Sequence, residues 1–417
     1  MREIDHINNV LKKIVLDNYS FNMALRSSLK NEKRKNDSQF INTITAVCGG
    51  YLRHYYSLER VVKNHFSDDD VACQQMVEII LADKLFSKRL SLDDLFTTLN
   101  HKFPNKEKEY EEFVNQFSEP HQLIGDDIAY GSDEYIHLRY NLPMFLVKMW
   151  RKNCKHTLSN KLFKSLRKNE QRLFRINTSK MSVSDFHNKY NDLELLDDLF
   201  VVSKEKGKKL PYLFELDALD MKAGYTFALS DLEIDFMRGV AIYGSTSTNV
   251  LDEIYAQYGS YLKLDYLCGD QKHFFEVNNK IRRYSLSDIS VYECHADAMR
   301  TCISKPVHTF IVSPSNSAFQ KLSEESDYFL RISQDQLDGW IKEENLALDN
   351  AALLVEEGGD LVYIIPTLCR NETYGLISKF LDKHPEFSLI KENQLFPFDK
   401  YGSLLYFAVL KKEIKHD

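Results

Sequence analysis

The stretch Glu357-Gly-Gly-Asp-Leu-Val-Tyr-Ile-Ile-Pro-Thr-Leu-Cys-Arg-Asn-Glu-Thr373 decides the fold of the C-terminal half of this chain. Two glycines precede a run of β-branched and aromatic residues, and a helical pattern follows the run. This order is typical of a strand that rises through a sheet and ends at a ligand-binding edge. We therefore expect functional positions near Pro366, where the strand ends.

Other β-rich runs surround this strand and alternate with helical ones from Gly224 onward. The expected strands are Val240–Tyr243, Tyr261–Leu264, Val291–Cys294, His308–Val312, Leu361–Ile365 and Leu404–Leu410. Such alternation predicts an α/β domain with a parallel, doubly wound, Rossmann-like sheet over residues 224–417.

The N-terminal part has a different pattern. From Ile4 to about Phe117, apolar residues recur every three or four positions and glycines are few, which predicts an all-α domain over residues 1–130. The segment 120–131 is polar and rich in turn-forming residues, so we interpret it as a linker. The remaining residues, 131–223, are assigned to a small α+β domain.

The composition restricts the class of protein. With 417 residues and 43% hydrophobic side chains, the chain can fill two or three cores. It has no apolar run of 18 residues, so we expect a cytoplasmic protein without a membrane partner. We also expect the protein to be a monomer. The seven cysteines are scattered and never form a Cys-x-x-Cys pair, which argues against a metal site and a disulfide framework.

The charge is distributed unevenly. The net charge is −7, yet the segment from Lys148 to Lys180 contains eleven basic residues and one acid, Glu170. This excess predicts that the segment binds the phosphate backbone of RNA, the alternative being a solvated surface helix. The RNA-binding residues expected in it are Lys148, Arg151, Lys152, Lys164, Arg167, Lys168, Arg172 and Arg175.

Several motifs resemble those of the RsmB (Sun) family of RNA 5-methylcytosine methyltransferases. Gly358 to Tyr363 matches the start of the family's run Gly-Gly-x-Leu-Val-Tyr-Ser-Thr-Cys. The segment Ala46-Val-Cys-Gly-Gly-Tyr-Leu-Arg-His54 resembles part of the NusB-like domain that opens these proteins. The resemblance implies an RNA-binding helical domain with Arg53 near the RNA face, followed by a small domain and a class I methyltransferase domain.

The resemblance also implies a cofactor, S-adenosyl-L-methionine. Its binding residues would be Gly244 in the first loop, Asp265 after the second strand, with Asp270 as the alternative, and Asp297 in the motif His295-Ala-Asp-Ala298. The first loop, from Ile242 to Asn249, keeps only Gly244 and lacks the family's acid and paired glycines.

Both cysteine positions of the family are substituted. The family's Asp-Ala-Pro-Cys-Ser motif corresponds to Val312-Ser-Pro-Ser-Asn316, which places Ser315 at one position, and Pro366 occupies that of the nucleophile. Cytosine carbon 5 becomes nucleophilic only after a thiolate adds to carbon 6, so we predict no catalytic residue at either position. The alternative is Cys369, three residues beyond Pro366, acting as a shifted nucleophile.

These observations favour an RsmB-like protein that binds RNA, ribosomal RNA or the ribosome in particular, and has lost cytosine methylation. Two other hypotheses remain open at this stage. One is an active S-adenosylmethionine-dependent ribosomal RNA methyltransferase with a shifted nucleophile, and the other is a NusB-like protein or RNA interaction module. Whether the chain is an enzyme is therefore left open by the sequence.

Overall fold

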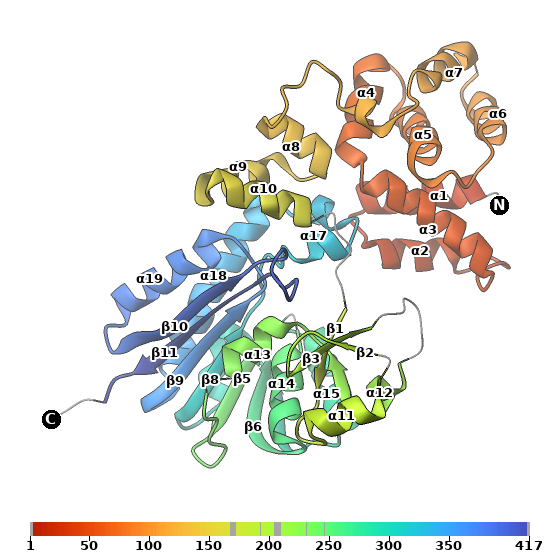
Figure 1. Cartoon of the computed structure of the whole chain (residues 1–417). Helices are drawn as coiled ribbons and strands as arrows, with labels where there is room; N and C mark the ends of the chain where they lie inside the picture. The colour runs from red at the N-terminus through yellow and green to blue at the C-terminus, as the bar shows by residue number, and fades with distance from the viewer. Residues whose placement is uncertain are drawn as a thin grey trace. The chain divides into compact units, whose positions relative to one another are not determined.

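The computed structural model describes residues 3–104, 106–166, 172–191, 193–203, 210–230, 232–245 and 247–414 (Figure 1). The chain forms two compact units. The first consists of residues 1–168 together with 321–333, and the second of residues 169–320 together with 334–417. Each unit has a hydrophobic core of its own.

The described part of the first unit is helical, as the apolar periodicity predicts. Its α-helices are α1 (Glu3–Val15), α2 (Phe21–Leu29), α3 (Ser38–Leu52), α4 (Tyr55–His65), α5 (Val71–Ala82), α6 (Leu92–Lys102), α7 (Glu107–Asn115), α8 (Asp133–Tyr140), α9 (Met144–Asn153), α10 (His156–Ser165) and α17 (Lys321–Glu324). Shorter helical turns are η1 (Asp83–Ser87), η2 (Pro120–Leu123) and η4 (Tyr328–Arg331).

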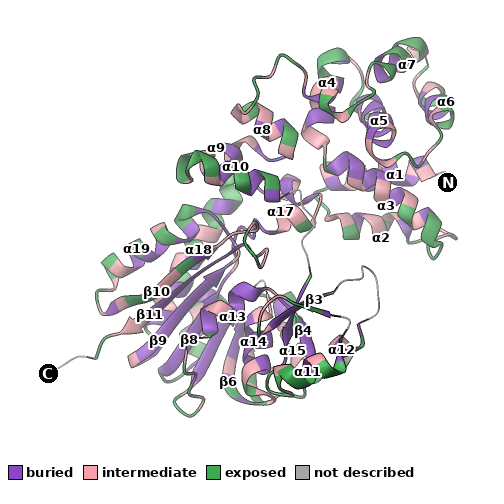
Figure 2. Cartoon of the chain, viewed as in Figure 1, coloured by how far each residue is buried: buried purple, intermediate pink, exposed green. Residues whose placement is uncertain are grey.

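Local sequence explains why these helices begin where they do. The side chains of Ser20, Asp37, Asp70, Ser91 and Ser132 each accept a hydrogen bond from a backbone N–H of the helix that follows. Such caps satisfy N–H groups that have no partner inside the helix. Helices α1 to α7 then bury their apolar faces in one core (Figure 2).

The second unit begins with a small antiparallel sheet of order β2-β3-β1-β4. Its elements are β1 (Leu173–Ile176), α11 (Val183–Lys189), β2 (Leu193–Leu195), β3 (Phe200–Ser203), α12 (Pro211–Phe214) and β4 (Ala218–Asp220). The small α+β part of the prediction thus corresponds to this sheet, whereas α8, α9 and α10, which the sequence grouped with it, belong to the first unit.

A seven-stranded sheet of order β10-β11-β9-β8-β5-β6-β7 forms the main part of the second unit. Strands β5 to β9 are parallel, and β11 runs antiparallel to both β9 and β10. The elements are α13 (Ala223–Leu229), β5 (Val240–Gly244), α14 (Asn249–Tyr258), β6 (Tyr261–Cys268), α15 (Gln271–Tyr284), β7 (Ser287–Glu293), η3 (Ala296–Ala298), α16 (Met299–Cys302), β8 (Val307–Ser313), α18 (Gln334–Ala352), β9 (Val355–Ile365), η5 (Arg370–Glu372), α19 (Tyr374–Lys383), β10 (Phe387–Leu395) and β11 (Leu405–Lys412).

Helices cover both faces of this sheet. One face packs against α13, α14 and α15, and the other against α16, α18 and α19, so that successive residues of the central strands enter two different cores. The central strands β5, β8, β9 and β11 are almost entirely buried in Figure 2. This arrangement confirms the predicted doubly wound α/β fold.

Several strand bounds differ from the prediction. β7 begins at Ser287 and β9 at Val355, four and six residues before their expected starts. Strand β6 continues to Cys268, four residues beyond its expected end at Leu264, and β10 was not expected at all. β10 lies at the edge of the sheet and has many half-exposed residues, so its sequence lacks the apolar run of a buried strand. No helix in the described part of the chain is long and apolar enough to span a bilayer.

Candidate functional site

The carboxyl ends of the parallel strands meet at one edge of the main sheet. Strands β5 to β9 end there at Gly244, Cys268, Glu293, Ser313 and Ile365. In sheets of this type the ligand binds outside this edge. The structure thus brings the predicted positions Gly244, Asp297, Ser315 and Pro366 to the same edge, each in or directly after a strand.

The protein's own side chains occupy the space beside the first loop. A Cβ atom on Gly244 would lie 2.8 Å from the Tyr266 hydroxyl and 3.0 Å from His273 Nε2. At Gly269 a Cβ would lie only 2.1 Å from Ser245 Oγ. Gly244 is therefore needed for close packing inside the protein. The space that its missing side chain leaves, which a cofactor would need in order to approach the backbone, is filled by Tyr266 and His273.

Backbone groups of this loop are also paired. The Gly244 carbonyl accepts a hydrogen bond from Gly269 N–H at 2.9 Å, and Ser245 N–H donates to the Ser313 carbonyl at 3.2 Å. These bonds tie the end of β5 and the residue after it to the segment after β6 and to the last residue of β8. A ligand that needed the same groups would have to displace them.

The structure corrects the placement of Asp265. It pairs with Ala241 and Ser290 in the middle of the sheet, and Tyr292 O–H lies 3.4 Å from its Oδ1. Burial raises its pKa above the usual value for aspartate. The acid at the end of the strand is instead Asp270, the alternative, which accepts a hydrogen bond from His273 N–H and caps α15.

Asp297 lies in η3, in the segment that follows β7, and its side chain is exposed. It therefore stays at the sheet edge, whereas Asp265 lies three residues inside β6 and lines a cavity with residues from the opposite ends of the strands. The structure does not bring these two predicted cofactor residues together.

A buried carboxylate network stands where the catalytic motifs of the family would lie. Glu372 Oε1 accepts a hydrogen bond from Ser317 N–H at 2.7 Å, and its Oε2 accepts from Ser317 Oγ at 2.6 Å and Thr367 Oγ1 at 2.8 Å. These bonds join the segment after β8, which contains Ser315, to the segment after β9, which contains Pro366. Glu372 thus fixes the relative position of the two substituted positions.

A second buried acid, Glu344 of α18, accompanies Glu372. Its side chain is fully buried, and no hydrogen bond to either carboxylate oxygen is formed within the described residues. Burial, followed by the neighbouring Glu372 carboxyl, raises the pKa of Glu344 well above its usual range, which favours the protonated form of Glu344. The sequence analysis missed Glu344, although its spacing from the buried Leu337 and Leu348 places it on the apolar face of α18.

Cys369, the alternative nucleophile, is buried and has little thiolate character. Only 1% of its surface is exposed, and burial, reinforced by the Glu372 charge, raises its pKa to about 12. On the order of one thiol in 10⁵ is ionised at pH 7 at such a pKa. The geometry gives no support to a shifted nucleophile at this position.

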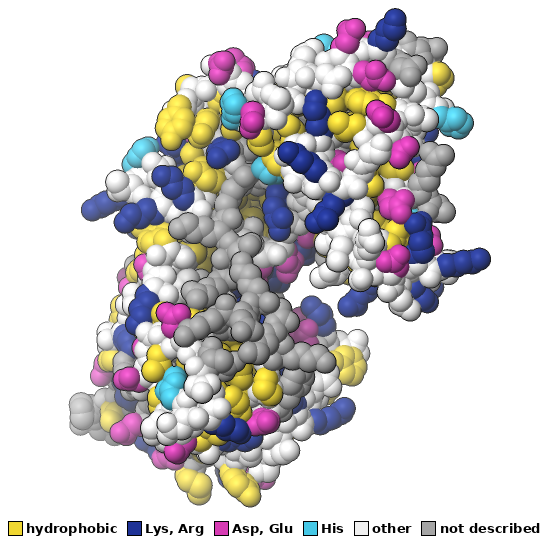
Figure 3. Space-filling view, turned by 45° about the vertical axis from the view of Figure 1, so that its right-hand side comes forward, with side chains coloured by type: hydrophobic (Ala, Val, Ile, Leu, Met, Phe, Trp, Pro, Cys, Tyr) yellow, Lys and Arg dark blue, Asp and Glu magenta, His cyan; other side chains and the backbone are white. Residues whose placement is uncertain are grey.

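A set of exposed lysines lies on α9 and α10 in the first unit. We call it the basic face, and its members are Lys148, Lys152, Lys155, Lys161 and Lys164. The opposite sides of the two helices bury Trp150 and Phe163, so the lysines are directed to solvent by the amphipathic pattern. Residues 141–166 contain no Asp or Glu. Dark blue side chains stand at the left margin of the upper part in Figure 3, at the height of α9 and α10 in Figure 1.

The remaining predicted RNA-binding arginines have different environments. Arg53 is exposed at the C-cap of α3, whereas Arg151 pairs with Asp133 at 3.1 Å. Arg172 is exposed on the second unit and forms an ion pair with Asp220. The predictions for Arg167 and Lys168 lie outside the described residues.

Arg175 requires a correction. Its side chain is 2% exposed and forms an ion pair with the fully buried Glu253 at 3.3 Å. It also donates a hydrogen bond to the Ile176 carbonyl. The predicted phosphate contact is therefore wrong for Arg175, because the guanidinium stabilises the junction between β1 and α14 instead of facing solvent.

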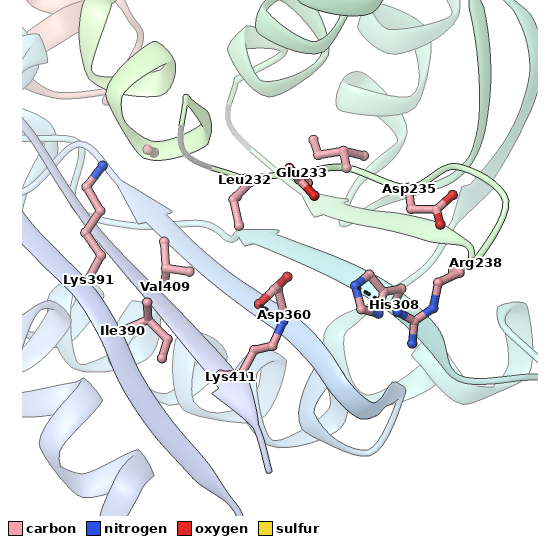
Figure 4. Close-up of a pocket in the computed structure, with 12 residues that line it drawn as sticks. Leu232, Glu233, Asp235, Arg238, His308, Asp360, Ile390, Lys391, Val409 and Lys411 are labelled. Atoms are coloured by element: carbon pink, nitrogen blue, oxygen red, sulfur yellow. Dashed lines mark hydrogen bonds and ion pairs between the residues drawn. The ribbon is translucent and has the colours of Figure 1, made fainter. Parts of the chain in front are cut away.

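A cavity of about 790 Å³ lies on the second unit away from the predicted site residues (Figure 4). It is lined by Ala228, Leu232, Glu233, Ile234, Asp235, Arg238, His308, Asp360, Ile390, Lys391, Val409 and Lys411. Asp360 and Lys411 form an ion pair at 2.9 Å, and His308 Nδ1 lies 2.9 Å from Glu356 Oε1. Arg238 and His308, which also line the cavity, both form ion pairs with Glu356. No group of three His, Cys, Asp or Glu side chains suited to a metal ion occurs among the described residues.

Comparisons with known proteins agree with this fold. No protein-family model and no curated protein sequence matches the chain. The crystal structure of PH0851 has a TM-score of 0.72 at 14% identity and covers 99% of both chains. A methyltransferase homolog protein from Pyrococcus horikoshii has a TM-score of 0.58 at 14% identity, covering 68% of this chain and 100% of the other. NSun6 from the same organism, solved with SFG, has a TM-score of 0.55 at 11% identity, covering 64% of this chain and 97% of the other. The chain thus has the methyltransferase-type fold that the sequence motifs predict.

Proposed function

We propose that this chain is an RNA-binding protein with a methyltransferase-type fold that no longer methylates cytosine, and that its partner is ribosomal RNA or the ribosome. The observation that carries the proposal is the absence of an ionisable thiol at the two positions that the family uses. Ser315 and Pro366 occupy them, and the nearby Cys369 is buried with a pKa of about 12. Without a thiolate, cytosine carbon 5 is not activated.

The cofactor side of the edge supports the same conclusion. S-adenosylmethionine needs a close backbone approach at the first loop and an acid at the end of the second strand. The space beside Gly244 is filled by Tyr266 and His273, and Asp265 lies inside the sheet. The first loop therefore does not fit the cofactor. Asp270 does lie just after β6, where the acid is expected, but the filled space beside Gly244 prevents a close approach to the backbone.

The basic face supports the RNA-binding part. Five lysines on and next to two adjacent helices, without an intervening acid, give a positive surface that attracts a polyanion over roughly 8 Å at physiological salt. Phosphate contacts of this kind carry affinity but do not read sequence. The RNA specificity that ribosomal targeting requires must therefore come from other contacts.

Two measurements on the full chain test the proposal. Transfer of tritium from labelled S-adenosylmethionine to RNA cytosines should be absent with ribosomal RNA as acceptor, because no thiolate reaches carbon 6. Fluorescence anisotropy with labelled ribosomal RNA fragments should show salt-dependent binding. Methyl transfer that is lost in Cys369→Ala would overturn the first part and establish the shifted nucleophile. Absence of RNA binding, with protein partners recovered instead, would favour the protein-interaction module.

A further inference from the structure

Two aromatic rings stack on each other at the surface of the first unit. His54, the residue before α4, and Phe86 of η1 have ring centroids 3.6 Å apart, and their planes are inclined by only 3°. Both residues are half-buried, so this pair of rings, which we call the ring pair, lies at the protein surface. The basic face includes neither residue.

A π-helical turn positions Phe86. In this turn, η1, Lys88 N–H donates to the Asp83 carbonyl at 2.7 Å, and Lys88 has the left-handed conformation with a φ of 52°. That conformation is unfavourable for a residue with a side chain. The buried Asp83 carboxylate offsets the strain, because it accepts hydrogen bonds from the N–H groups of Arg89 and Leu90, each at 3.0 Å. Turns of the π type in helices occur frequently at functional sites.

Gly50 lets this turn pack closely on α3. A Cβ atom on Gly50 would lie 3.3 Å from Phe86 Cβ and 3.6 Å from Ser87 Oγ, so a larger side chain there would push the turn away. Gly50 and His54 both belong to the sequence motif of residues 46–54. The structure thus gives this motif a physical task, since the glycine admits the turn and the histidine stacks on it.

Three exposed cations lie next to the ring pair in the sequence. Arg53 directly precedes one ring, and Lys88 and Arg89 closely follow the other. Within the described part of the chain, neither Lys88 nor Arg89 forms an ion pair. The segments 38–58 and 84–92 contain no Asp or Glu.

The nearest acids along the chain have other tasks. Asp83 is buried inside the turn, and Glu59 forms an ion pair with Lys63 at 2.7 Å. Asp93 and Asp94 lie in the first turn of α6, where the helix dipole stabilises a negative charge. The positive charge of the turn therefore remains available to an anionic ligand.

We propose that the ring pair and these cations form a stacking site for an unpaired base of single-stranded RNA. The inference rests on the proposed RNA-binding function and adds a contact to bases, which the basic face does not provide. The base stacks on the ring pair, while Arg53, Lys88 and Arg89 contact the neighbouring phosphates. Bases inside a duplex are already stacked and paired, so the site favours loops and single strands over duplexes.

A comparison of two strands with the full-length wild type tests the inference. The probe is a single-stranded oligoadenylate of about ten nucleotides, and the reference is a strand with the same phosphates but without bases. Fluorescence anisotropy should show that the oligoadenylate binds about 5- to 150-fold more tightly, the range that one stacked base provides. Equal affinity for the two strands would overturn the stacking site.

Variants then assign the stacking to the ring pair. Phe86→Leu removes the ring but keeps an apolar side chain at the margin of the core. It should weaken oligoadenylate binding by about the same 5- to 150-fold and leave both the salt dependence and the binding of the abasic strand unchanged. Phe86→Tyr retains the ring and should bind as the wild type does. Phe117→Leu, which removes a half-buried ring elsewhere at the margin of the same core, should also have no effect.

The outcomes distinguish this inference from the proposed function. If Phe86→Leu keeps the wild-type affinity for oligoadenylate, or if the wild type binds both strands equally and with salt dependence, only the stacking site is overturned. If the wild type binds neither strand, the stacking site and the RNA-binding proposal both fail. The comparison of strands needs no variant, so it decides the matter even if Phe86→Leu does not fold.

Discussion

Neutralising the basic face gives the sharpest test of RNA binding. We expect the triple change Lys148→Gln, Lys152→Gln and Lys164→Gln to weaken binding to all single-stranded RNA sequences by a similar factor. The three side chains are exposed and lie on helices whose opposite sides form the core. Glutamine keeps most of the side-chain length and removes only the charge, so the folded unit should remain as stable as the wild type within about 0.5 kcal/mol.

The magnitude follows from counterion release. Each phosphate neutralised on a single strand contributes about −0.7 to the slope of log K against log salt, so three lost contacts flatten the slope by roughly two. Between about 50 mM and about 200 mM salt, the affinity gap between the wild type and the variant should therefore narrow about 18-fold. Fluorescence anisotropy titrations at four salt concentrations measure both slopes directly.

A matched control uses lysines of the same unit outside the basic face. Lys12, Lys30 and Lys35 are exposed near α1 and α2, and their triple change to Gln removes the same charge. If the control variant flattens the slope of log K against log salt as much as the test variant does, RNA binding depends only on the net charge of the protein. If the test variant keeps the wild-type affinity and slope, the basic face is a solvated surface and the RNA-binding proposal loses its main support.

Three further predictions concern the second unit. We expect isothermal titration calorimetry with S-adenosylmethionine to show no binding, because Tyr266 and His273 fill the space beside Gly244; a dissociation constant in the low micromolar range contradicts this. We expect Glu344→Gln to gain stability relative to the wild type as the pH rises from about 5 to about 8, because only the wild type must retain a proton that the unfolded chain has released. Urea unfolding at several pH values measures the difference, and a gap that shrinks with rising pH would refute the assignment. Arg175→Ala should lower the free energy of unfolding by about 3–5 kcal/mol, since it leaves Glu253 buried without its cation; a loss below about 1 kcal/mol in denaturant unfolding contradicts the buried pair.

The architecture could be predicted from the sequence because the spacing of apolar residues reflects which side chains are buried. Runs such as Leu361–Ile365 are apolar on both sides, and in the structure successive residues of β9 enter the cores on the two faces of the sheet. The strand β10 could not be found in the same way, because its outer side is exposed and its sequence mixes polar and apolar residues. Patterns therefore identify central strands better than edge strands.

The candidate site was only partly predictable, because its decisive contacts are long-range. The sequence shows that the first loop keeps one glycine, but not that Tyr266 and His273 fill the space beside it. Asp265 was expected just after the second strand because aspartate often forms a turn. In the structure β6 continues through Asp265 to Cys268, and the chain turns only at Gly269. A charge count likewise cannot distinguish the buried Arg175 from the exposed Lys164.

Glu372 has a structural role at the sheet edge that does not depend on catalysis. Its carboxylate accepts hydrogen bonds from Ser317 and Thr367 and thereby joins the segments after β8 and β9. Removing the acid would leave these buried donors unsatisfied, at a cost of about 1–3 kcal/mol for each group. A cysteine at the position of Pro366 or Ser315 has no comparable structural task, because neither substitute takes part in this network. Glu372 is therefore needed for the packing of this sheet edge whether or not the chain has catalytic activity.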